Sequence, residues 1–228
     1  AGTGSRYAAG KKYSPTELKN DLALFKNILD DAHPGFYWFT PKHQMDEYFN
    51  RTKEAITDSL SERAFRTGLM YLAEKIKCGH TTIRFSKSYS EYLDTAKEAV
   101  FPITVYFWKD SAMVWNNINR NDSVIKRGLL VRSINKLSVS EIRNHLFEFL
   151  PGDGYSVSGK LQALNNGFAG IWKNVYGLRD SVQILATDSA GAEINSWLYP
   201  YYPKEDSALM SQRRPVEKRS KKEQKQRR

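Results

Sequence analysis

The chain has 228 residues, of which 40% are hydrophobic and 26% charged, with a formal net charge of +10. These proportions are ordinary for a folded globular protein, and no stretch approaches the ~20 consecutive apolar residues of a membrane-spanning helix. Residues 213–228 hold nine Lys or Arg and two Glu, so residues 1–212 carry only about +3 of that charge. We therefore expect no membrane span and no basic nucleic-acid-binding body.

The composition of the two ends of the chain indicates connecting segments. Residues 1–13 are small, polar and basic and lack the apolar stretch of a signal peptide, so we expect a linker there. Residues 204–228 predict a basic linker. A phosphate-binding arm is the alternative for this segment, but no aromatic residue is interleaved with its charges after residue 213.

Residues 14–98 predict a small helical bundle. Ser14 and Glu17 have the spacing of a capping box, Pro15 suits the first turn, and His33-Pro34-Gly35 ends the helix. A second helix is expected after Thr40-Pro41, and a third after a capping box at Ser59–Glu62. Apolar residues recur at helical spacing in the first and third helices: Leu18, Leu22, Phe25, Leu29, Phe65, Leu69, Leu72 and Ile76.

A Gly-His pair follows the third helix. Gly79 is expected to end the helix in the left-handed conformation, and Thr81–Phe85 favour a strand. His80, between them, has three interpretations: a catalytic base, a metal ligand or a turn residue. Metal binding finds no support, because none of the four histidines has a metal-ligand spacing and Cys78 is the single cysteine. We expect no metal site and no cofactor.

Residues 99–203 predict a compact mixed α/β domain, which makes the whole chain α+β. Strands are expected in 100–108, 112–118, 128–134, 181–187 and 192–199, and helices from Ser138 to Phe149 and over 156–174. Asn135-Lys136 and residues 188–191 predict turns. Asp153 lies in a Gly-rich loop and is interpreted as a turn residue. The aromatic run Phe36–Phe39 is compatible with a groove or with core packing.

Two parts of the sequence resemble a known family. Residues 122–150, "DSVIKRGLLVRSINKLSVSEIRNHLFEFL", are similar to a bacterial PDZ-like domain, and "LFKNILDDAHPGFYWFT" with "FRTGLMYLAEKIKCGHTTIRF" resembles the N-terminal region of tail-specific (carboxy-terminal processing) serine peptidases. The likeness covers about residues 18–200 and is greatest to the tricorn-like branch of Bacteroidetes-type bacteria. Lys136 stands where the family has glycine, and the Gly-Asp before the strand at Gly128 is missing.

The resemblance implies a function. The chain would be an N-terminal part of an extracytoplasmic serine peptidase that presents a polypeptide substrate, inactive without a catalytic domain carrying the serine. His80 would be the general base, unless the enzyme uses a Ser-Lys pair. Gly128, Leu129, Leu130 and Val131 would bind the peptide. The alternative is a PDZ-like peptide-binding module without hydrolase activity, in which a peptide strand adds beside residues 128–134.

Overall fold

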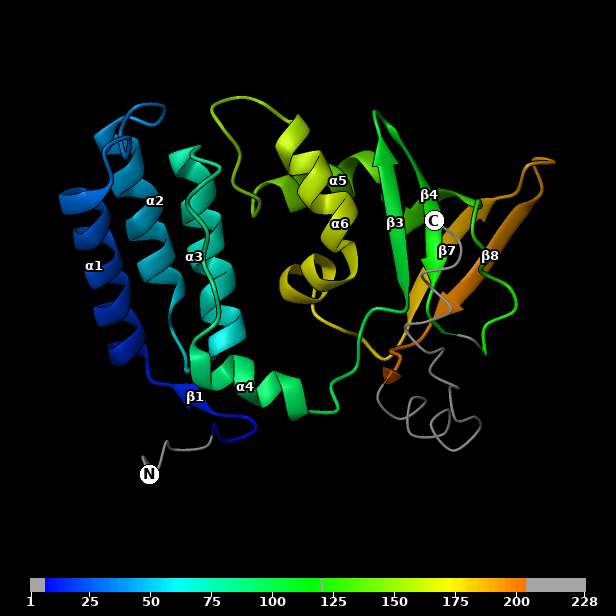
Figure 1. Ribbon diagram of the computed structural model, residues 1–228, viewed down its shortest axis with the longest axis horizontal. Helices are drawn as coiled ribbons and strands as arrows, with labels where there is room; N and C mark the ends of the chain where they lie inside the picture. The colour runs from blue at the N-terminus through cyan, green and yellow to red at the C-terminus, as the bar shows by residue number, and fades with distance from the viewer. Residues whose placement is uncertain (1–6, 120, 204–228) are drawn as a thin grey trace, which may run out of the picture.

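A computed structural model describes residues 7–119 and 121–203, which form two units side by side. The helical unit consists of α1 (Pro15–Ala32), α2 (Lys42–Ala55) and α3 (Glu62–Ile76). The sheet unit consists of an antiparallel sheet with two helices packed on it (Figure 1). The predicted α+β class is confirmed. The segments at 1–6 and 204–228, including the predicted basic linker, lie outside the described residues.

The helical unit forms much as its sequence predicts. The Ser14 hydroxyl accepts the Glu17 N–H at 3.3 Å and the Glu17 carboxylate accepts the Ser14 N–H at 2.8 Å, which completes the capping box of α1. The apolar stripes meet in one core, because α2 packs between α1 and α3. The buried members of this core are Leu18, Leu22, Leu29, Phe36, Met45, Phe49, Ile56, Leu72 and Ile76.

The start of α3 differs from the prediction. Ser61, not Ser59, is the N-cap, and its hydroxyl accepts the Ala64 N–H at 3.3 Å. Leu60–Ser61 form strand β2, which pairs with β1 (Lys12–Tyr13) and holds Ser61 in the extended conformation that an N-cap requires. The pairing partner lies nearly fifty residues away, so local spacing did not identify the cap.

The segment after α3 also differs. Lys77, with φ 57°, takes the left-handed position, and Gly79 does not. Thr81–Phe85 form no strand, and α4 (Lys87–Thr95) follows them with Ser86 as its N-cap. The strand prediction was wrong because β propensity needs a neighbouring strand to pair with, and this segment runs beside α3, on the far side of α6 from the sheet (Figure 1).

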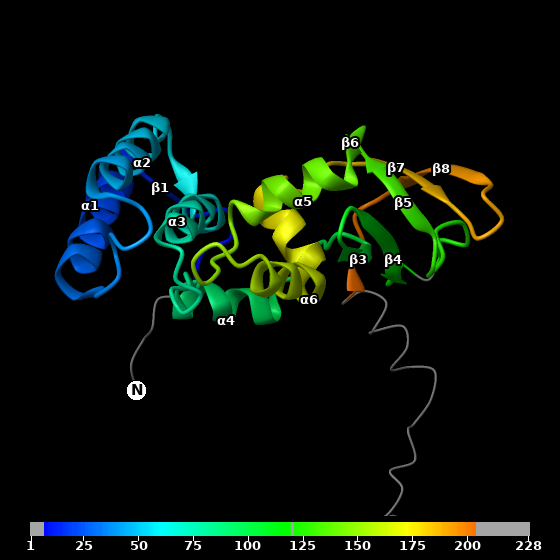
Figure 2. The same ribbon diagram turned by 90° about the horizontal axis from the view of Figure 1, so that it is seen from above.

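The sheet unit has the strand order β3-β4-β5-β7-β8, with β6 paired to β5, and every pairing is antiparallel. Its strands are β3 (Ile103–Trp108), β4 (Ser111–Asn117), β5 (Leu130–Ile134), β6 (Leu137–Ser138), β7 (Val182–Thr187) and β8 (Glu193–Leu198). The helices α5 (Val139–Phe147) and α6 (Ser158–Val175) lie between the sheet and the helical unit (Figure 2). The larger hydrophobic core fills the space between these helices and the sheet.

The turn between β5 and β6 accommodates Lys136 in place of glycine. Asn135 has φ 49° and Lys136 has φ 67°, so both residues adopt the left-handed conformation of a two-residue hairpin turn. The Asn135 N–H donates to the Gln183 carbonyl at 2.8 Å, and its side-chain oxygen accepts the Gln183 N–H at 3.0 Å. These bonds to β7 stabilise a turn that local preference alone disfavours at Lys136.

Candidate functional site

His80 lies at the junction of the two units. Its side chain is exposed and lines a groove of about 640 Å³. The groove lies between three loops: the α1–α2 loop, the segment after α3 and the α5–α6 loop. Its lining residues are His33, Pro34, Gly35, Trp38, Phe39, Ile76, Lys77, Cys78, His80, Thr81, Asp153 and Gly154. An exposed imidazole in a groove is available for proton transfer to a bound group.

The loop that carries His80 is tied to the sheet unit by two hydrogen bonds. The Gly79 N–H donates to the Asp153 carboxylate at 2.8 Å, and the Gly154 N–H donates to the Lys77 carbonyl at 2.8 Å. The Lys77 ammonium also lies 3.9 Å from the centre of the Tyr155 ring. The position of His80 therefore depends on residues 153–155, although Asp153 was expected to be only a turn residue.

Gly79 is required here by space. A Cβ at this position would lie 2.9 Å from Asp153 Oδ1, closer than real Cβ atoms come to another heavy atom. Gly79 has no positive φ, so the reason for glycine expected from the sequence, a left-handed helix end, is wrong. The glycine instead lets the Asp153 carboxylate reach the backbone amide beside His80.

His33 reaches the same loop from the end of α1. Its Nε2 lies 2.8 Å from Thr81 Oγ1, and these two atoms share a hydrogen bond. Its Nδ1 is buried and has no hydrogen-bond partner among the described residues. His33 is thus a packing and bonding residue of the groove wall. The remaining histidines lie on helices, His43 exposed on α2 and His145 beside Tyr176, at 5.2 Å between ring centres.

The aromatic run after α1 divides between core and groove. Phe36 is 2% exposed in the helical core, whereas Trp38 is 77% exposed and lines the groove with Phe39. The Phe39 ring meets the Tyr155 ring edge to face, at 5.9 Å between centres. The groove wall therefore includes exposed aromatic surface from Trp38 and Phe39, which suits contact with an apolar group.

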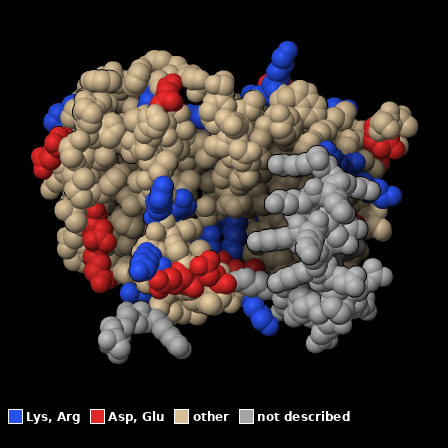
Figure 3. All heavy atoms as spheres, in the orientation of Figure 1, with Lys and Arg blue, Asp and Glu red and all other residues tan. Residues whose placement is uncertain are grey.

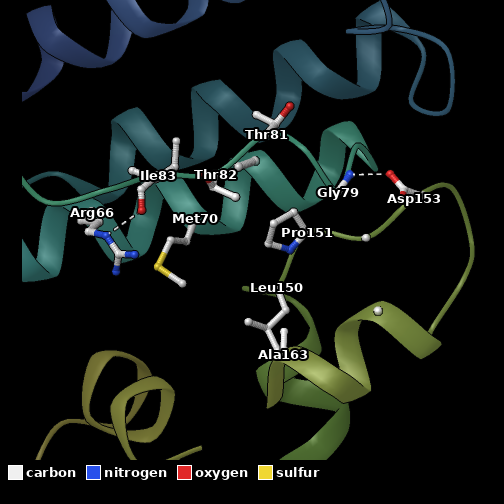
Figure 4. Close-up of a pocket in the computed structure, with 13 residues that line it drawn as sticks. Arg66, Met70, Gly79, Thr81, Thr82, Ile83, Leu150, Pro151, Asp153 and Ala163 are labelled. Atoms are coloured by element: carbon white, nitrogen blue, oxygen red, sulfur yellow. Dashed lines mark hydrogen bonds between the residues drawn. The ribbon is translucent and has the colours of Figure 1, made fainter. Parts of the chain in front are cut away.

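A second pocket adjoins the groove. It has a volume of about 380 Å³ and lies between α3, residues 79–83 and the start of α6 (Figure 4). Thr81 and Asp153 line both cavities. At its far end, the Arg66 Nε donates to the Ile83 carbonyl at 2.8 Å. Burial lowers the pKa of Arg66, and the nearby Arg63 lowers it further.

A buried ion pair joins the two units near these cavities. Glu74 of α3, 8% exposed, accepts a hydrogen bond from the Lys160 ammonium of α6 and lies 2.9 Å from the Lys75 ammonium. Lys160 also donates to the Phe147 carbonyl at 3.1 Å. Each of these charges has a partner of opposite sign, so the contact between α3 and α6 buries no unpaired charge among them.

The predicted peptide-binding residues lie elsewhere, inside the sheet. The Gly128 N–H donates to the Val114 carbonyl at 2.9 Å, the Leu129 carbonyl accepts the Val114 N–H at 2.9 Å, and Val131 pairs with Ala186 of β7. The strand β5 is therefore central, and it offers no open edge for an added peptide strand. The expectation that a peptide strand adds beside residues 128–134 does not fit this geometry. It arose because the sequence alone does not give the order of the strands in the sheet.

The outer edge of β3 is also occupied at one position. The side-chain oxygen of Asn165 on α6 accepts the Phe107 N–H at 2.7 Å, and its Nδ2 donates to the Phe107 carbonyl at 3.0 Å. A side-chain amide thus satisfies both backbone groups that an added strand would use at this residue.

Two further observations concern metal-binding groups and membrane-spanning helices among the described residues. Among residues 7–119 and 121–203, no three His, Cys, Asp or Glu side chains are grouped so that they could hold a metal ion. Within the same residues, no helix combines the length and apolar character of a bilayer-spanning segment.

Comparison with known proteins gives a likeness of fold. No family model matches the chain, and no curated protein matches it. A serine-to-alanine mutant of CPAF, a chlamydial protease, is 12% identical, with a TM-score of 0.57 over 87% of this chain and 38% of that chain. Mature CPAF has a TM-score of 0.53 at 12% identity, over 89% of this chain and 38% of that chain. Its complex with lactacystin has a TM-score of 0.50 at 13% identity, over 89% of this chain and 39% of that chain. The chain spans less than two fifths of CPAF, and its fold is distantly related to that of a protease.

Proposed function

We propose that this chain is part of a serine-type peptidase and supplies its general base, His80. The observation that carries the proposal is the placement of His80. The imidazole is exposed in a groove, and the loop before it is hydrogen-bonded to a second unit. The fold likeness to CPAF supports a protease-related role, while the tail-specific family, its tricorn-like branch and an extracytoplasmic location rest on the sequence resemblance.

In this proposal the attacking hydroxyl comes from outside the described residues. The Thr81 hydroxyl in the groove is hydrogen-bonded to His33, and no described side chain is hydrogen-bonded to His80. Cys78 lines the groove but packs against the helical core. A neutral imidazole near pH 7 can accept the proton of a serine hydroxyl and later return it to the leaving amine.

The groove would also hold the substrate. Trp38, Phe39 and Tyr155 offer aromatic surface near His80, so an extended polypeptide can place apolar side chains against them. The alternative of a peptide-binding module without hydrolase activity has less support, because the backbone of Gly128–Val131 is already paired with β4 and β7.

The test compares two histidine variants in the longer protein that contains this chain. His80→Ala is expected to lower peptide hydrolysis by at least about a thousandfold, the scale at which loss of a triad member acts. His43→Ala, which changes an exposed histidine on α2, is the matched control and is expected to keep full activity. Labelling by a fluorophosphonate probe should decrease in parallel with hydrolysis.

Two outcomes would contradict the proposal. Full activity of His80→Ala would remove His80 from the mechanism while leaving the protease-related fold intact. Hydrolysis by the 228-residue chain alone, at a rate similar to that of the longer protein, would show that the nucleophile lies within these residues.

A further inference from the structure

Two arginines on α3, one turn apart, have unlike surroundings. Arg63 binds the Glu98 carboxylate at 2.7 Å and the Asn174 side-chain oxygen at 2.9 Å. Arg66 donates through Nε to the Ile83 carbonyl and lies 4.4 Å from the centre of the Phe85 ring. No carboxylate of the described residues lies within ion-pair distance of Arg66. The charge of Arg63 is thus paired, and that of Arg66 is not.

The environment of Arg66 makes this lack of an anion costly. Burial and the neighbouring Arg63 both lower the pKa of Arg66, so its charged form is held in a partly dehydrated position. A backbone carbonyl and a ring face compensate only part of the lost hydration. A carboxylate would complete the compensation, because guanidinium and carboxylate form two parallel hydrogen bonds.

The space in front of Arg66 is apolar. The pocket it lines is bounded on its other sides mainly by hydrocarbon, and the Asp153 carboxylate lines it near Gly79, at the end away from Arg66. The apolar lining residues are Met70, Ala73, Ile83, Leu150, Pro151 and Ala163. Its volume of about 380 Å³ falls near the lower end of small-molecule sites, about 300–1,000 Å³. Figure 3 shows the molecule hollowed between the helical and sheet units, with basic side chains in the hollow. Arg66 itself is only partly buried, so the pocket is open to solvent at that end.

We propose that this pocket binds a small apolar carboxylate, with the carboxylate on Arg66 and the hydrocarbon against Met70, Leu150 and Ala163. Such a group occurs in a free fatty acid and in the C-terminal residue of a polypeptide. Both sources present the same chemistry to the pocket, an apolar chain that ends in a carboxylate. The site does not depend on the proposed peptidase function, since His80 lines the neighbouring groove and not this pocket.

The first test uses ligands and the unmodified chain. Octanoate and N-acetyl-leucine represent the two sources, and 1-octanol is the control that lacks the charge. Binding is followed by calorimetry and by the NMR signal of the Met70 methyl group. We expect at least one carboxylate to bind about tenfold more tightly than 1-octanol, the scale of a charge-assisted hydrogen bond. Preference for octanoate or for N-acetyl-leucine distinguishes the fatty acid from the peptide terminus.

The second test uses variants. Arg66→Gln is expected to weaken carboxylate binding about tenfold or more and to leave 1-octanol binding unchanged. Arg127→Gln removes an arginine that lies 4.0 Å from the Trp115 ring, away from the pocket, and should change neither. Ala163→Leu fills the pocket and should weaken both ligands. If Arg66→Gln does not fold, Arg66→Lys replaces it in this test, because that variant keeps the positive charge.

The proposal is overturned if neither carboxylate binds at millimolar concentration, or if both bind no more tightly than 1-octanol. It is also overturned if Arg66→Gln, folded by circular dichroism, binds the carboxylate as the unmodified chain does. Each of these results leaves the assignment of His80 untouched, because none of them measures hydrolysis.

Discussion

The helical unit and the sheet unit differ in how far apart along the chain the residues lie that make their stabilising contacts. In the helical unit the caps of α1 and α3 are formed within four residues, and the core comes from regular stripes on consecutive segments. In the sheet unit, β5 pairs with β7 fifty or more residues later, and Asn165 reaches Phe107 from α6. The candidate site draws on both units: one contributes His80, and the other contributes Asp153. The comparison teaches that neither unit alone defines the site.

The largest expected effect tests whether the two units unfold together. Trp172 of α6 is 2% exposed and stacks on Phe101 at 4.8 Å between ring centres. Trp172→Ala should lower the free energy of unfolding by about 3–5 kcal/mol, because it leaves a cavity in the larger core. Urea unfolding by circular dichroism measures this, and amide exchange in α1 shows whether the helical unit is destabilised too.

We expect α1 to lose protection with the sheet unit, since α3 contacts α6. Unchanged exchange in α1 would mean that the units unfold independently. Trp197→Ala is the control, because Trp197 is 52% exposed, and it should change stability by less than about 0.5 kcal/mol.

The next effect tests the ion pair between the units. Lys160→Met removes one of the two ammonium partners of the buried Glu74 and should lower the free energy of unfolding by about 3 kcal/mol. The loss should not be larger, because Lys75 remains 2.9 Å from Glu74. Adding Glu74→Leu should recover only part of that loss, because it removes the buried carboxylate but leaves the Lys75 ammonium, with a side chain that is 15% exposed, without this partner. Lys87→Met, at an exposed pair with Glu91 of 3.9 Å, should change stability by under about 1 kcal/mol. Equal effects of the two lysine substitutions would contradict the burial argument.

A smaller effect tests the link between the units beside His80. Asp153→Ala should raise the exchange rate of the Gly79 amide about tenfold and leave global stability within about 1 kcal/mol, because one exposed hydrogen bond is lost. Asp153→Asn keeps an acceptor oxygen and should restore most of the protection. Gly79→Ala should resemble Asp153→Ala, because its Cβ displaces the carboxylate.

Asp21→Ala, an exposed carboxylate on α1, is the matched control for these variants. If the Gly79 amide exchanges equally in Asp153→Ala and in Asp21→Ala, the hydrogen bond does not order the loop. His80 signals in the NMR spectrum should shift in the first variant and not in the second.

The smallest effect concerns a cap that is formed locally within the sheet unit. Hydrogen bonds from the Ser138 side chain and backbone lower the pKa of Glu141 from its usual 4.5. A lowered folded-state pKa stabilises the protein above pH 4.5, and this contribution is lost as the pH falls through the folded-state value. Glu141→Gln keeps a capping side chain and should flatten the decline of Tm below pH 4.5. If the decline of Tm below pH 4.5 is unchanged in Glu141→Gln, other carboxylates cause that decline.

The sequence predicted those features whose determinants lie close together in the chain. The capping box at Ser14, the helix cap at Ser138, the apolar stripe of α3 and the turn at Asn135-Lys136 were all predicted, and all are present. The errors occurred where a distant partner decides. The strand expected at Thr81–Phe85 had no strand to pair with, and β5 proved central because β4 and β7 flank it.

By itself the sequence determined the α+β class and the helix starts at Ser14 and Ser138, because spacings of a few residues specify caps and stripes. The assignment of His80 as a base came from a family resemblance and stays a prediction. Only the tertiary structure placed His33 on Thr81 across 48 residues and Asp153 on Gly79 across 74 residues. It alone showed that no carboxylate of residues 7–119 and 121–203 pairs with Arg66. Such pairs depend on how units pack, and packing is set by the combined burial of many side chains and not by any local pattern.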